Sequence, residues 1–378
     1  MIENSVFNEL PEEIKCNLEK LNITEPSKVQ ERIIPMILER KSVVFQSETG
    51  TGKTFAYLLP ILKNIETFRK DNPQDVSVKA LVCAPTFELA SQINQAAKSV
   101  SSTKTALFIG GAPVKRQIET LKEKPEIVIG TPARLVELIR LKKLKVSKLQ
   151  FVVFDEADRL IKKELTEECQ ALKAELPENT VSIACSATIS KKTQDFFSAS
   201  SLEILPEEDV LKRNISHWAL YAENRDKIEV LRKFLIAENP EKALVFTSRS
   251  DQVENIHAKL SFKKIDCMAL HAKSDKVSRK AAIDKFRSGK AKILITSDLS
   301  ARGLDIQNIT HVIQMDLPRD TDFFIHRAGR TARAGKKGIN VLIGDEYELK
   351  QFALLEKKLG FTVYPKEVRE GKVIAPLI

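Results

Sequence analysis

The sequence of 378 residues has few cysteines and no long hydrophobic segment. Its five cysteines are scattered and form no Cys-x-x-Cys pair, which argues against a disulfide framework or a zinc site and favours a reducing compartment. No apolar run approaches the length that spans a membrane, and the acidic N-terminus lacks the basic and apolar regions of a signal peptide. We therefore expect a cytoplasmic protein with no membrane partner.

Aromatic residues are also scarce, at 6% of the chain, and they do not cluster into a platform for stacking nucleic-acid bases. Charged residues are abundant, at 30%, and the net charge is +10. The excess of positive charge is unevenly distributed: residues 206–378 carry 32 Lys and Arg against 24 Asp and Glu, whereas residues 1–205 carry 29 against 27. This balance favours a polyanionic partner, although a solvated surface alone would also produce it.

Two series of short apolar strand candidates alternate with amphipathic helix candidates such as Glu88–Val100, Arg134–Leu141 and Lys276–Arg287. The first series of strands is Ser42–Gln46, Ala80–Cys83, Thr105–Phe108, Ile127–Ile129, Phe151–Phe154 and Ser182–Ala184. The second series is Ala243–Phe246, Cys267–Leu270, Ile293–Ile295, His311–Gln314 and Ile339–Ile343. Nearly continuous apolar strands are typical of parallel sheets covered on both faces, so we expect two α/β domains. The predicted domains are residues 1–205 and 215–378, joined by a polar linker at 206–214.

The segment SETGTGKT, from Ser47 to Thr54, lies between a strand candidate and a helix candidate. Except at Ser47, it matches the phosphate-binding pattern G-x-x-x-x-G-K-[ST]. Glycines let the backbone curl so that its N–H groups face phosphate oxygens; Lys53 can reach the β- and γ-phosphates, and Thr54 can ligate Mg²⁺. An ordinary glycine turn is the alternative, but the strand–loop–helix context predicts a nucleotide site. Its loop residues are Ser47, Glu48, Thr49, Gly50, Thr51, Gly52, Lys53 and Thr54.

A second feature is the apolar run that ends at two adjacent carboxylates, Asp155 and Glu156, with Asp158 following. Buried carboxylates are costly unless something neutralises them. One interpretation is a strand end that meets solvent, with Asp158 capping the next helix. The other is a Mg²⁺ ion beside Thr54, for which Asp155 supplies an oxygen, directly or through water. Glu156 would then orient or deprotonate an attacking water, which predicts hydrolysis.

With this loop and the Asp-Glu-Ala-Asp tetrapeptide at 155–158, the chain resembles the DEAD-box family of ATP-dependent RNA helicases over nearly its whole length. The resemblance implies two tandem RecA-like domains, each a mostly parallel sheet flanked by helices, that use ATP and Mg²⁺. It also implies an adenine-recognition element within residues 1–34, where Gln30 bonds the adenine and Phe7 stacks near it. Ser186 and Thr188 would couple the ATP site to strand separation through Asp158.

In the second half, the segment HRAGRTARAG at 326–335 resembles the motif whose arginines meet the γ-phosphate. The resemblance assigns Arg330 and Arg333 to that role and His326 to coupling; a basic surface helix is the alternative. Such arginines contribute about 10³–10⁵ in rate in other nucleotide hydrolases. Gly303 and Asp305 are assigned to the nucleotide by the same resemblance.

The implied RNA contacts are backbone N–H groups, hydroxyls and guanidiniums, which suit sequence-independent, salt-sensitive binding of the sugar–phosphate backbone. They are Pro85, Thr86, Gly110, Gly111, Thr131, Pro132, Arg134, Arg249, His271, Arg279 and Thr296.

Several residues depart from the family pattern. Phe87 stands where the family usually has arginine, Lys276 where it has glutamine, and Ala133 and Ala332 where it has glycine. Ala133 is harmless only if its φ angle is negative. Because these changes leave the hydrolytic residues intact, we expect ATP chemistry to be complete and coupling to RNA to be slightly weakened.

The function expected from these features is an RNA-dependent ATPase that unwinds short RNA duplexes or remodels RNA–protein complexes through ATP-driven closure of two domains. The alternative is an ATP-gated RNA clamp with little strand separation. A DNA helicase and a small-molecule kinase are less favoured, the latter because it leaves the second domain unexplained. We expect a monomer whose specificity for particular RNAs comes from protein partners.

Overall fold

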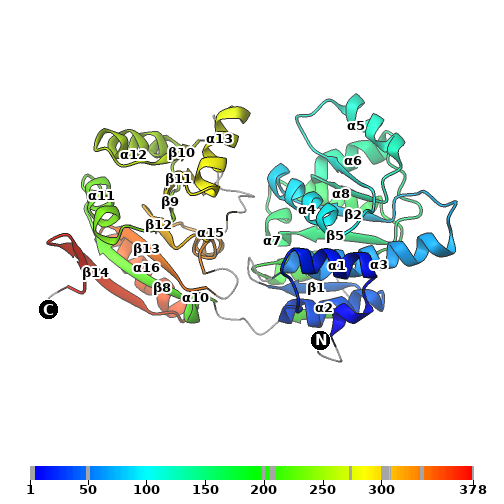
Figure 1. Ribbon diagram of the computed structural model, residues 1–378, viewed down its shortest axis with the longest axis horizontal. Helices are drawn as coiled ribbons and strands as arrows, with labels where there is room; N and C mark the ends of the chain where they lie inside the picture. Colours follow the sequence, from blue (N-terminus) through cyan, green and yellow to red (C-terminus); the bar gives the residue numbers. More distant parts are fainter. Residues whose placement is uncertain are drawn as a thin grey trace. The chain divides into compact units, whose positions relative to one another are not determined.

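The computed structural model describes residues 5–47, 52–197, 201–204, 210–271, 275–298, 306, 308–332 and 336–376. The chain divides into two compact units, Met1–Pro206 and Glu207–Ile378, and each contains its own sheet (Figure 1). Each unit also has its own clusters of buried hydrophobic residues. Within the described ranges, no helix combines the length and the apolar character needed to cross a membrane.

The sheet of the first unit is entirely parallel among its described strands, in the order β3-β4-β2-β5-β6-β1-β7. Its strands are β1 (Val43–Gln46), β2 (Ala80–Cys83), β3 (Thr105–Phe108), β4 (Ile127–Gly130), β5 (Phe151–Asp155), β6 (Val181–Ser186) and β7 (Ser201–Ile204). The helical elements are η1 (Val6–Glu9), α1 (Glu12–Lys20), α2 (Lys28–Leu38), α3 (Lys53–Asp71), α4 (Phe87–Val100), α5 (Val114–Thr120), η2 (Leu121–Glu123), α6 (Pro132–Arg140), α7 (Ala157–Leu160), α8 (Thr166–Ala174) and α9 (Lys191–Phe197).

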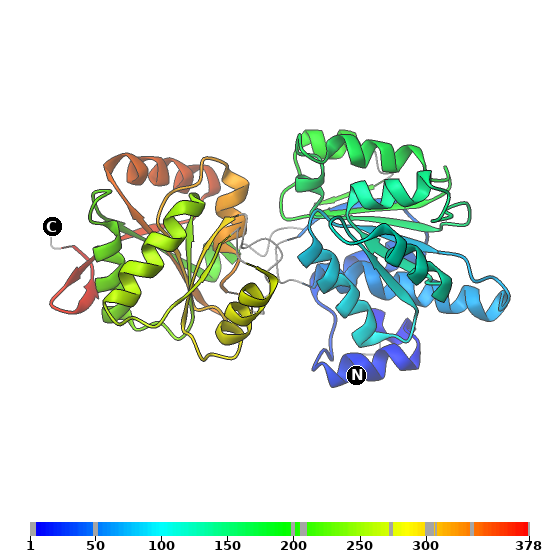
Figure 2. The same ribbon diagram turned by 90° about the horizontal axis from the view of Figure 1, so that it is seen from above.

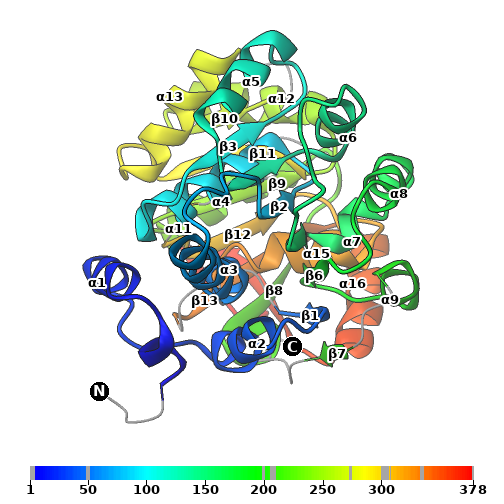
Figure 3. The ribbon, with the colours of Figure 1, turned by 90° about the vertical axis from the view of Figure 1, so that its right-hand side faces the viewer.

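Alternation along the strands sends successive side chains into two separate cores. In β5, for example, Phe151 and Val153 pack in one core, whereas Val152 and Phe154 pack in the other. Helices α1 to α4 cover the first core, and α6, α8 and α9 contribute to the second. Figure 3 shows α2, α3 and α4 side by side on one face. Because both faces are covered, apolar residues occupy consecutive positions along each strand.

The second unit contains a mostly parallel sheet in the order β10-β11-β9-β12-β13-β8-β14-β15, in which only the described pair β14 and β15 is antiparallel. Its strands are β8 (Ile215–Tyr221), β9 (Ala243–Thr247), β10 (Met268–Leu270), β11 (Ile293–Ser297), β12 (His311–Gln314), β13 (Gly338–Gly344), β14 (Val363–Arg369) and β15 (Lys372–Ile374). Its helices are α10 (Val210–Arg213), α11 (Lys227–Glu238), α12 (Ser250–Phe262), α13 (Lys276–Arg287), α15 (Thr321–Ala328) and α16 (Glu346–Leu359). Helices again lie on both sides of the sheet (Figure 2): α11 and α12 cover one face, and α13, α15 and α16 cover the other.

The predicted α/β class with two parallel-sheet domains is confirmed, and all eleven predicted strands are present within two residues of their expected ends. Four strands were not predicted: β7, β8, β14 and β15. Strand β8 mixes buried, half-buried and exposed positions irregularly, and β14 has no fully buried position, so both lack a continuous apolar run and a clean alternation. The polar sequence of Arg69–Ser77 predicts a surface loop, and this prediction is partly wrong because α3 continues to Asp71.

Two buried histidines of the second unit make its stability sensitive to acid. Burial lowers the pKa of His217, in β8, and of His311, in β12, from 6.5 to about 4. The unfolded chain therefore binds more protons than the folded chain between these pH values, and stability falls as the pH is lowered through this window.

We expect the second unit to lose about 3 kcal/mol of unfolding free energy between pH 6.5 and 5 through these two groups, at about 1.4 kcal/mol per pKa unit. Denaturant unfolding followed by the fluorescence of Trp218 measures this, because Trp218 is the only tryptophan and lies in β8. The control is the double variant His217→Asn, His311→Asn, which should show a shallower dependence on pH. Equal pH dependence in both proteins would contradict this account.

Candidate nucleotide site and the strand ends around it

The predicted phosphate loop begins where β1 ends. The N–H of Ser47 donates to the carbonyl of Ser186, at 2.9 Å, which ties the start of the loop to the end of β6. The next four loop residues, Glu48, Thr49, Gly50 and Thr51, lie outside the described residues. Gly52 has a φ of 92°, and a Cβ atom there would lie 2.5 Å from Nε2 of Gln30. Both conformation and crowding therefore require glycine at the end of the loop.

Helix α3 starts immediately after this glycine, so Lys53 and Thr54 occupy its first turn. The N–H groups of a first helical turn have no partners within the helix, and they carry the positive end of the helix dipole. An anionic phosphate is favoured at such a position. The local fold thus places the lysine and threonine of the motif where the sequence predicts.

Asp155 is the last residue of β5 and pairs in register with Cys185 of β6. Its side chain is only 4% exposed, so the interpretation of a strand end meeting solvent is wrong. Oδ2 accepts a hydrogen bond from the Tyr57 hydroxyl at 2.8 Å. Oδ1 accepts from the N–H of Glu156 at 2.8 Å and from Sγ of Cys185 at 3.2 Å. Burial raises the pKa of the Asp155 carboxyl, and the charge of Lys53 and the Tyr57 hydrogen bond oppose that rise.

Glu156 turns the chain from β5 into α7 with a left-handed backbone, φ 51° and ψ 52°. This conformation is unfavourable for a residue with a side chain and is found preferentially at functional sites. Its carboxylate is held by Arg159, whose guanidinium lies 2.9 Å from Oε2. Arg159 was not among the residues predicted from the sequence, although its position one turn after Glu156 is the usual spacing for a helical ion pair.

Asp158 contacts the Ser-Ala-Thr segment as its predicted coupling role requires. Oδ2 of Asp158 accepts a hydrogen bond from the Thr188 hydroxyl at 2.9 Å. The hydroxyl of Ser186 accepts from the N–H groups of both Asp158 and Thr188, each at 3.4 Å. The structure therefore brings these three residues together, while their role in coupling stays a prediction.

The proposed adenine residues occupy different environments. Gln30 is buried; its Oε1 accepts from the N–H of Ser27 at 2.9 Å, and its Nε2 donates to the carbonyl of Gly52 at 3.2 Å. Gln30 thus links the start of α2 to the end of the phosphate loop. Phe7 is buried in the first core. Contact of either residue with adenine stays a prediction.

The RNA-contact candidates of the first unit lie at the carboxyl ends of three neighbouring strands. Pro85 and Thr86 follow β2, Gly110 and Gly111 follow β3, and Thr131 with Pro132 follows β4. Arg134 is buried, and its Nη1 donates a hydrogen bond to the carbonyl of Ala112 at 3.0 Å, which ties the segment after β3 to α6. Ala133 lies within α6, so its backbone φ is negative as the substitution requires.

In the second unit two of the RNA-contact candidates follow strand ends. Arg249 follows β9 and bonds Asp251 at 2.6 Å, and His271 follows β10. Arg279 is half-buried on α13. Thr296 is fully buried in β11, where its hydroxyl donates to the carbonyl of Ser297, so the described structure does not present it on the surface. Gly303, Asp305 and Arg333 lie outside the described residues, as does the side chain of Lys276.

Arg330 and His326 are buried, His326 within α15 and Arg330 just after it. Ala332, which follows, has a φ of 56°, a conformation that favours glycine. The family pattern places glycine at this position, and the substitution therefore carries a backbone cost that Ala133 does not.

Arg327 was not predicted from the sequence, yet it organises this edge of the second unit. Only 1% exposed, its guanidinium bonds Asp298 after β11 at 2.6 Å, Asp316 after β12 at 3.2 Å and Ser248 after β9 at 2.8 Å. Burial lowers the pKa of Arg327, but the two carboxylates outweigh it and raise that pKa overall. The same charge keeps the pKa of Asp316 below its usual value despite burial. One arginine therefore fixes three strand ends.

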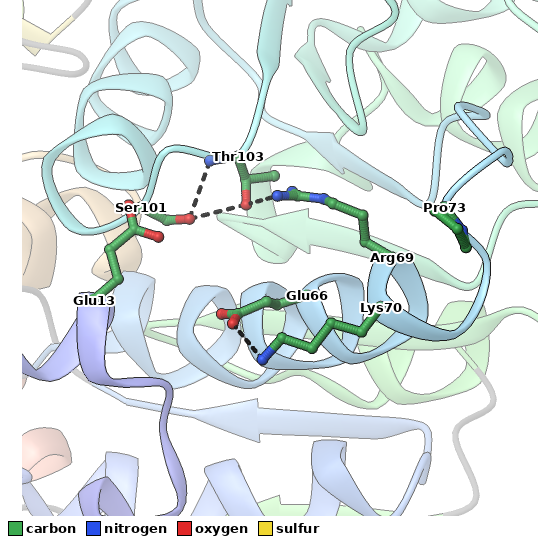
Figure 4. Close-up of a pocket in the computed structure, with 7 residues that line it drawn as sticks. All are labelled: Glu13, Glu66, Arg69, Lys70, Pro73, Ser101 and Thr103. Atoms are coloured by element: carbon green, nitrogen blue, oxygen red, sulfur yellow. Dashed lines mark hydrogen bonds and ion pairs between the residues drawn. The ribbon is translucent and has the colours of Figure 1, made fainter.

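A cavity of about 440 Å³ in the first unit lies elsewhere (Figure 4). Its lining residues are Glu13, Glu66, Arg69, Lys70, Pro73, Ser101 and Thr103. Arg69 is paired with Glu126 at 2.6 Å, and Lys70 with Glu66 at 2.9 Å. A helix rises about 1.5 Å per residue, so Arg69 is about 24 Å from Lys53 along α3. The cavity is not part of the nucleotide site.

Comparison with known proteins extends over both units. Residues 27–196 match the family model described as DEAD/DEAH box helicase, and residues 226–335 match the helicase conserved C-terminal domain. The chain is 36% identical to the DEAD-box ATP-dependent RNA helicase CshC of Bacillus cereus, covering 94% of this chain and 91% of that protein. It is 35% identical to the probable ATP-dependent RNA helicase YfmL of Bacillus subtilis, covering 95% and 96%.

Among solved structures, Dbp5 of S. cerevisiae bound to RNA and ADP BeF3 is similar, with a TM-score of 0.83, 26% identity and 96% of each chain covered. The helicase Mss116 bound to ssRNA and UDP-BeF has a TM-score of 0.84 at 26% identity, covering 96% of this chain and 79% of that one.

Replacement of Arg327 by methionine should destabilise the second unit by about 3–5 kcal/mol, because it leaves Asp298 and Asp316 without their buried countercharge. Arg327→Lys should be intermediate, since a lysine keeps the charge but cannot bond several strand ends at once. Denaturant unfolding followed by Trp218 measures both. Arg225→Met, at an exposed arginine of the same unit, should change stability by about 0.5 kcal/mol or less. A loss no larger than that control would exclude the organising role.

Proposed function

The chain belongs to the DEAD-box family of ATP-dependent RNA helicases, whose members are ATPases, and from this premise we propose that it couples ATP hydrolysis to the separation of short RNA duplexes or the remodelling of RNA–protein complexes. The observation that carries the proposal is the buried carboxylate of Asp155 at the carboxyl end of β5, near the lysine that begins α3. Ligands of parallel α/β sheets bind at this edge.

Mg²⁺ fits the residues present. The described residues contain no group of three or more His, Cys, Asp or Glu that could hold a metal, which excludes a cage built from such side chains in that part of the chain. Mg²⁺ is usually held by one or two protein oxygens together with substrate phosphates and water, and Thr54 and Asp155 supply such oxygens. When bound, Mg²⁺ neutralises charge on the phosphates. Lys53 and the first turn of α3 would bind the phosphates.

Glu156 would hold the attacking water and accept its proton. Its left-handed backbone and its ion pair with Arg159 fix the carboxylate one residue beyond Asp155. A water molecule positioned in this way adds to the terminal phosphorus while the bond to the β-phosphate oxygen breaks, giving ADP and phosphate. The reaction is therefore hydrolysis rather than transfer to a second substrate.

RNA would bind along the strand ends of both units through the backbone and polar groups described above, without selecting sequence. Support comes from the solved relatives bound to RNA. We propose that ATP and RNA together close the two units, so that Arg330 and Arg333 reach the phosphate, and that phosphate loss reopens them. We also propose that the protein acts as a cytoplasmic monomer directed by partner proteins.

A second candidate is an ATP-gated RNA clamp with little strand separation. Phe87, the first residue of α4, is 45% exposed beside Thr86 at the RNA edge, where the family pattern has arginine. An apolar ring cannot bond phosphate or a carboxylate, so coupling between RNA and ATP would be weaker.

We expect Glu156→Gln to bind ATP and RNA with nearly unchanged affinity but to lose at least about 10²-fold in turnover, because an amide cannot accept the proton. Phosphate release and RNA retention in the presence of ATP measure the two effects. The control is Glu164→Gln, at an exposed glutamate of the same unit, which should retain full activity. Multiple turnover at the wild-type rate would remove Glu156 from the mechanism.

A strand-displacement assay on a short RNA duplex, with phosphate release measured in parallel, separates the two candidate functions. We expect RNA to stimulate phosphate release and ATP to drive displacement, and Phe87→Arg to increase the displacement obtained per ATP. RNA-stimulated hydrolysis without displacement in either protein would favour the clamp. A competitor of 2′-deoxy chemistry that binds as well as RNA would favour a DNA substrate.

A further inference from the structure

Tyr57 lies on α3 one turn after Thr54. It is completely buried and belongs to the first core, so its ring has the environment of an ordinary core aromatic. Its hydroxyl, in contrast, makes a polar contact. It donates a hydrogen bond to Oδ2 of Asp155, at the end of β5, at 2.8 Å. The hydroxyl of Thr54 also interacts with the Tyr57 hydroxyl and opposes the rise that burial causes in the pKa of Tyr57.

The bonds to Asp155 can be counted against the capacity of a carboxylate, which has two acceptor positions on each oxygen. Both positions of Oδ1 are used, one by the N–H of Glu156 and one by Sγ of Cys185. One position of Oδ2 is used by Tyr57. The donors among the described residues therefore leave a single position, on Oδ2.

We propose that Tyr57 is a positioning residue of the metal site, which holds the Asp155 carboxylate so that only one oxygen, Oδ2, is presented to Mg²⁺ or to its bound water. Cys185 supports the same orientation from β6, as a weaker donor. The inference rests on the proposed function, because it assumes that Asp155 faces the metal. It adds that Asp155 would serve the metal site, directly or through water, with one oxygen, and that an aromatic core position determines which oxygen that is.

The test is the affinity of the chain for AMP-PNP, measured by calorimetry with excess Mg²⁺ and again with EDTA. The ratio of the two affinities is the gain due to Mg²⁺. Tyr57→Phe keeps the ring and removes the hydroxyl, so it should reduce this gain about tenfold, as expected for a hydrogen bond to a charged group. Affinity in EDTA should stay within about twofold of wild type. Cys185→Ala should reduce the gain by about two- to threefold.

Tyr221→Phe is the matched control, because Tyr221 is 60% exposed in the second unit and should leave both affinities unchanged. Asp155→Asn should abolish the gain, and adding Tyr57→Phe to it should cause no further loss, since the two residues act through one contact. Such non-additivity would support the proposal.

Three results would overturn the positioning role: an equal loss with Mg²⁺ and with EDTA, a larger gain in Tyr57→Phe, or full additivity with Asp155→Asn. If Tyr57→Phe does not fold, an unchanged gain in Cys185→Ala overturns it instead. A wild-type chain whose affinity is independent of Mg²⁺ would refute the metal assignment of the proposed function itself, a failure distinguishable from the others.

Discussion

The carboxylate of Asp155 can be buried only because three donors meet it, and the architecture of the first unit follows from that requirement. Strand β5 must end in register with Cys185 of β6, and α3 must begin close enough to bring Tyr57 over the same group. Removing a carboxylate from water without such partners costs several kcal/mol. The glycine at 52 serves the same end, because its left-handed backbone turns the chain directly into α3.

In the second unit the buried charge is a cation, the guanidinium of Arg327, and its partners are hydrogen-bond acceptors. Arg327 binds the ends of β9, β11 and β12 together, whereas Asp155 is itself held by neighbouring elements. In both units the buried charge lies at the carboxyl edge of a parallel sheet, the edge at which ligands of such sheets bind. Fixing these edges fixes the loops that carry the candidate ATP and RNA residues. The buried charged groups, which are costly to remove from water, therefore lie at the sheet edges that carry the candidate functional residues.

The elements around the candidate nucleotide site could be predicted from the sequence, because each is specified by a contiguous stretch of residues. The strand–loop–helix around Lys53 and the apolar run before Asp155 are contiguous patterns, and both elements form where expected. Tyr57, Cys185 and Arg327 could not be found in that way. Tyr57 and Cys185 sit at apolar positions of a helix and a strand, and only a contact between distant segments distinguishes them from core residues. Strand β8 was not predicted because its burial pattern shows neither a continuous apolar run nor a regular alternation of buried and exposed residues.

The residues that depart from the family pattern differ in their backbone strain and in their exposure to solvent. Ala133 lies in a helix, where alanine is the favoured residue, so nothing is lost there. Ala332 adopts φ 56° at a cost of about 1–2 kcal/mol, although its buried methyl group packs in the core beside α15 and offsets part of this. Among these three residues, Phe87 places an exposed apolar side chain at the edge where we propose that RNA binds. We therefore expect the consequence to fall on the proposed coupling of RNA binding to ATP hydrolysis, and not on the proposed roles of Asp155 and Glu156.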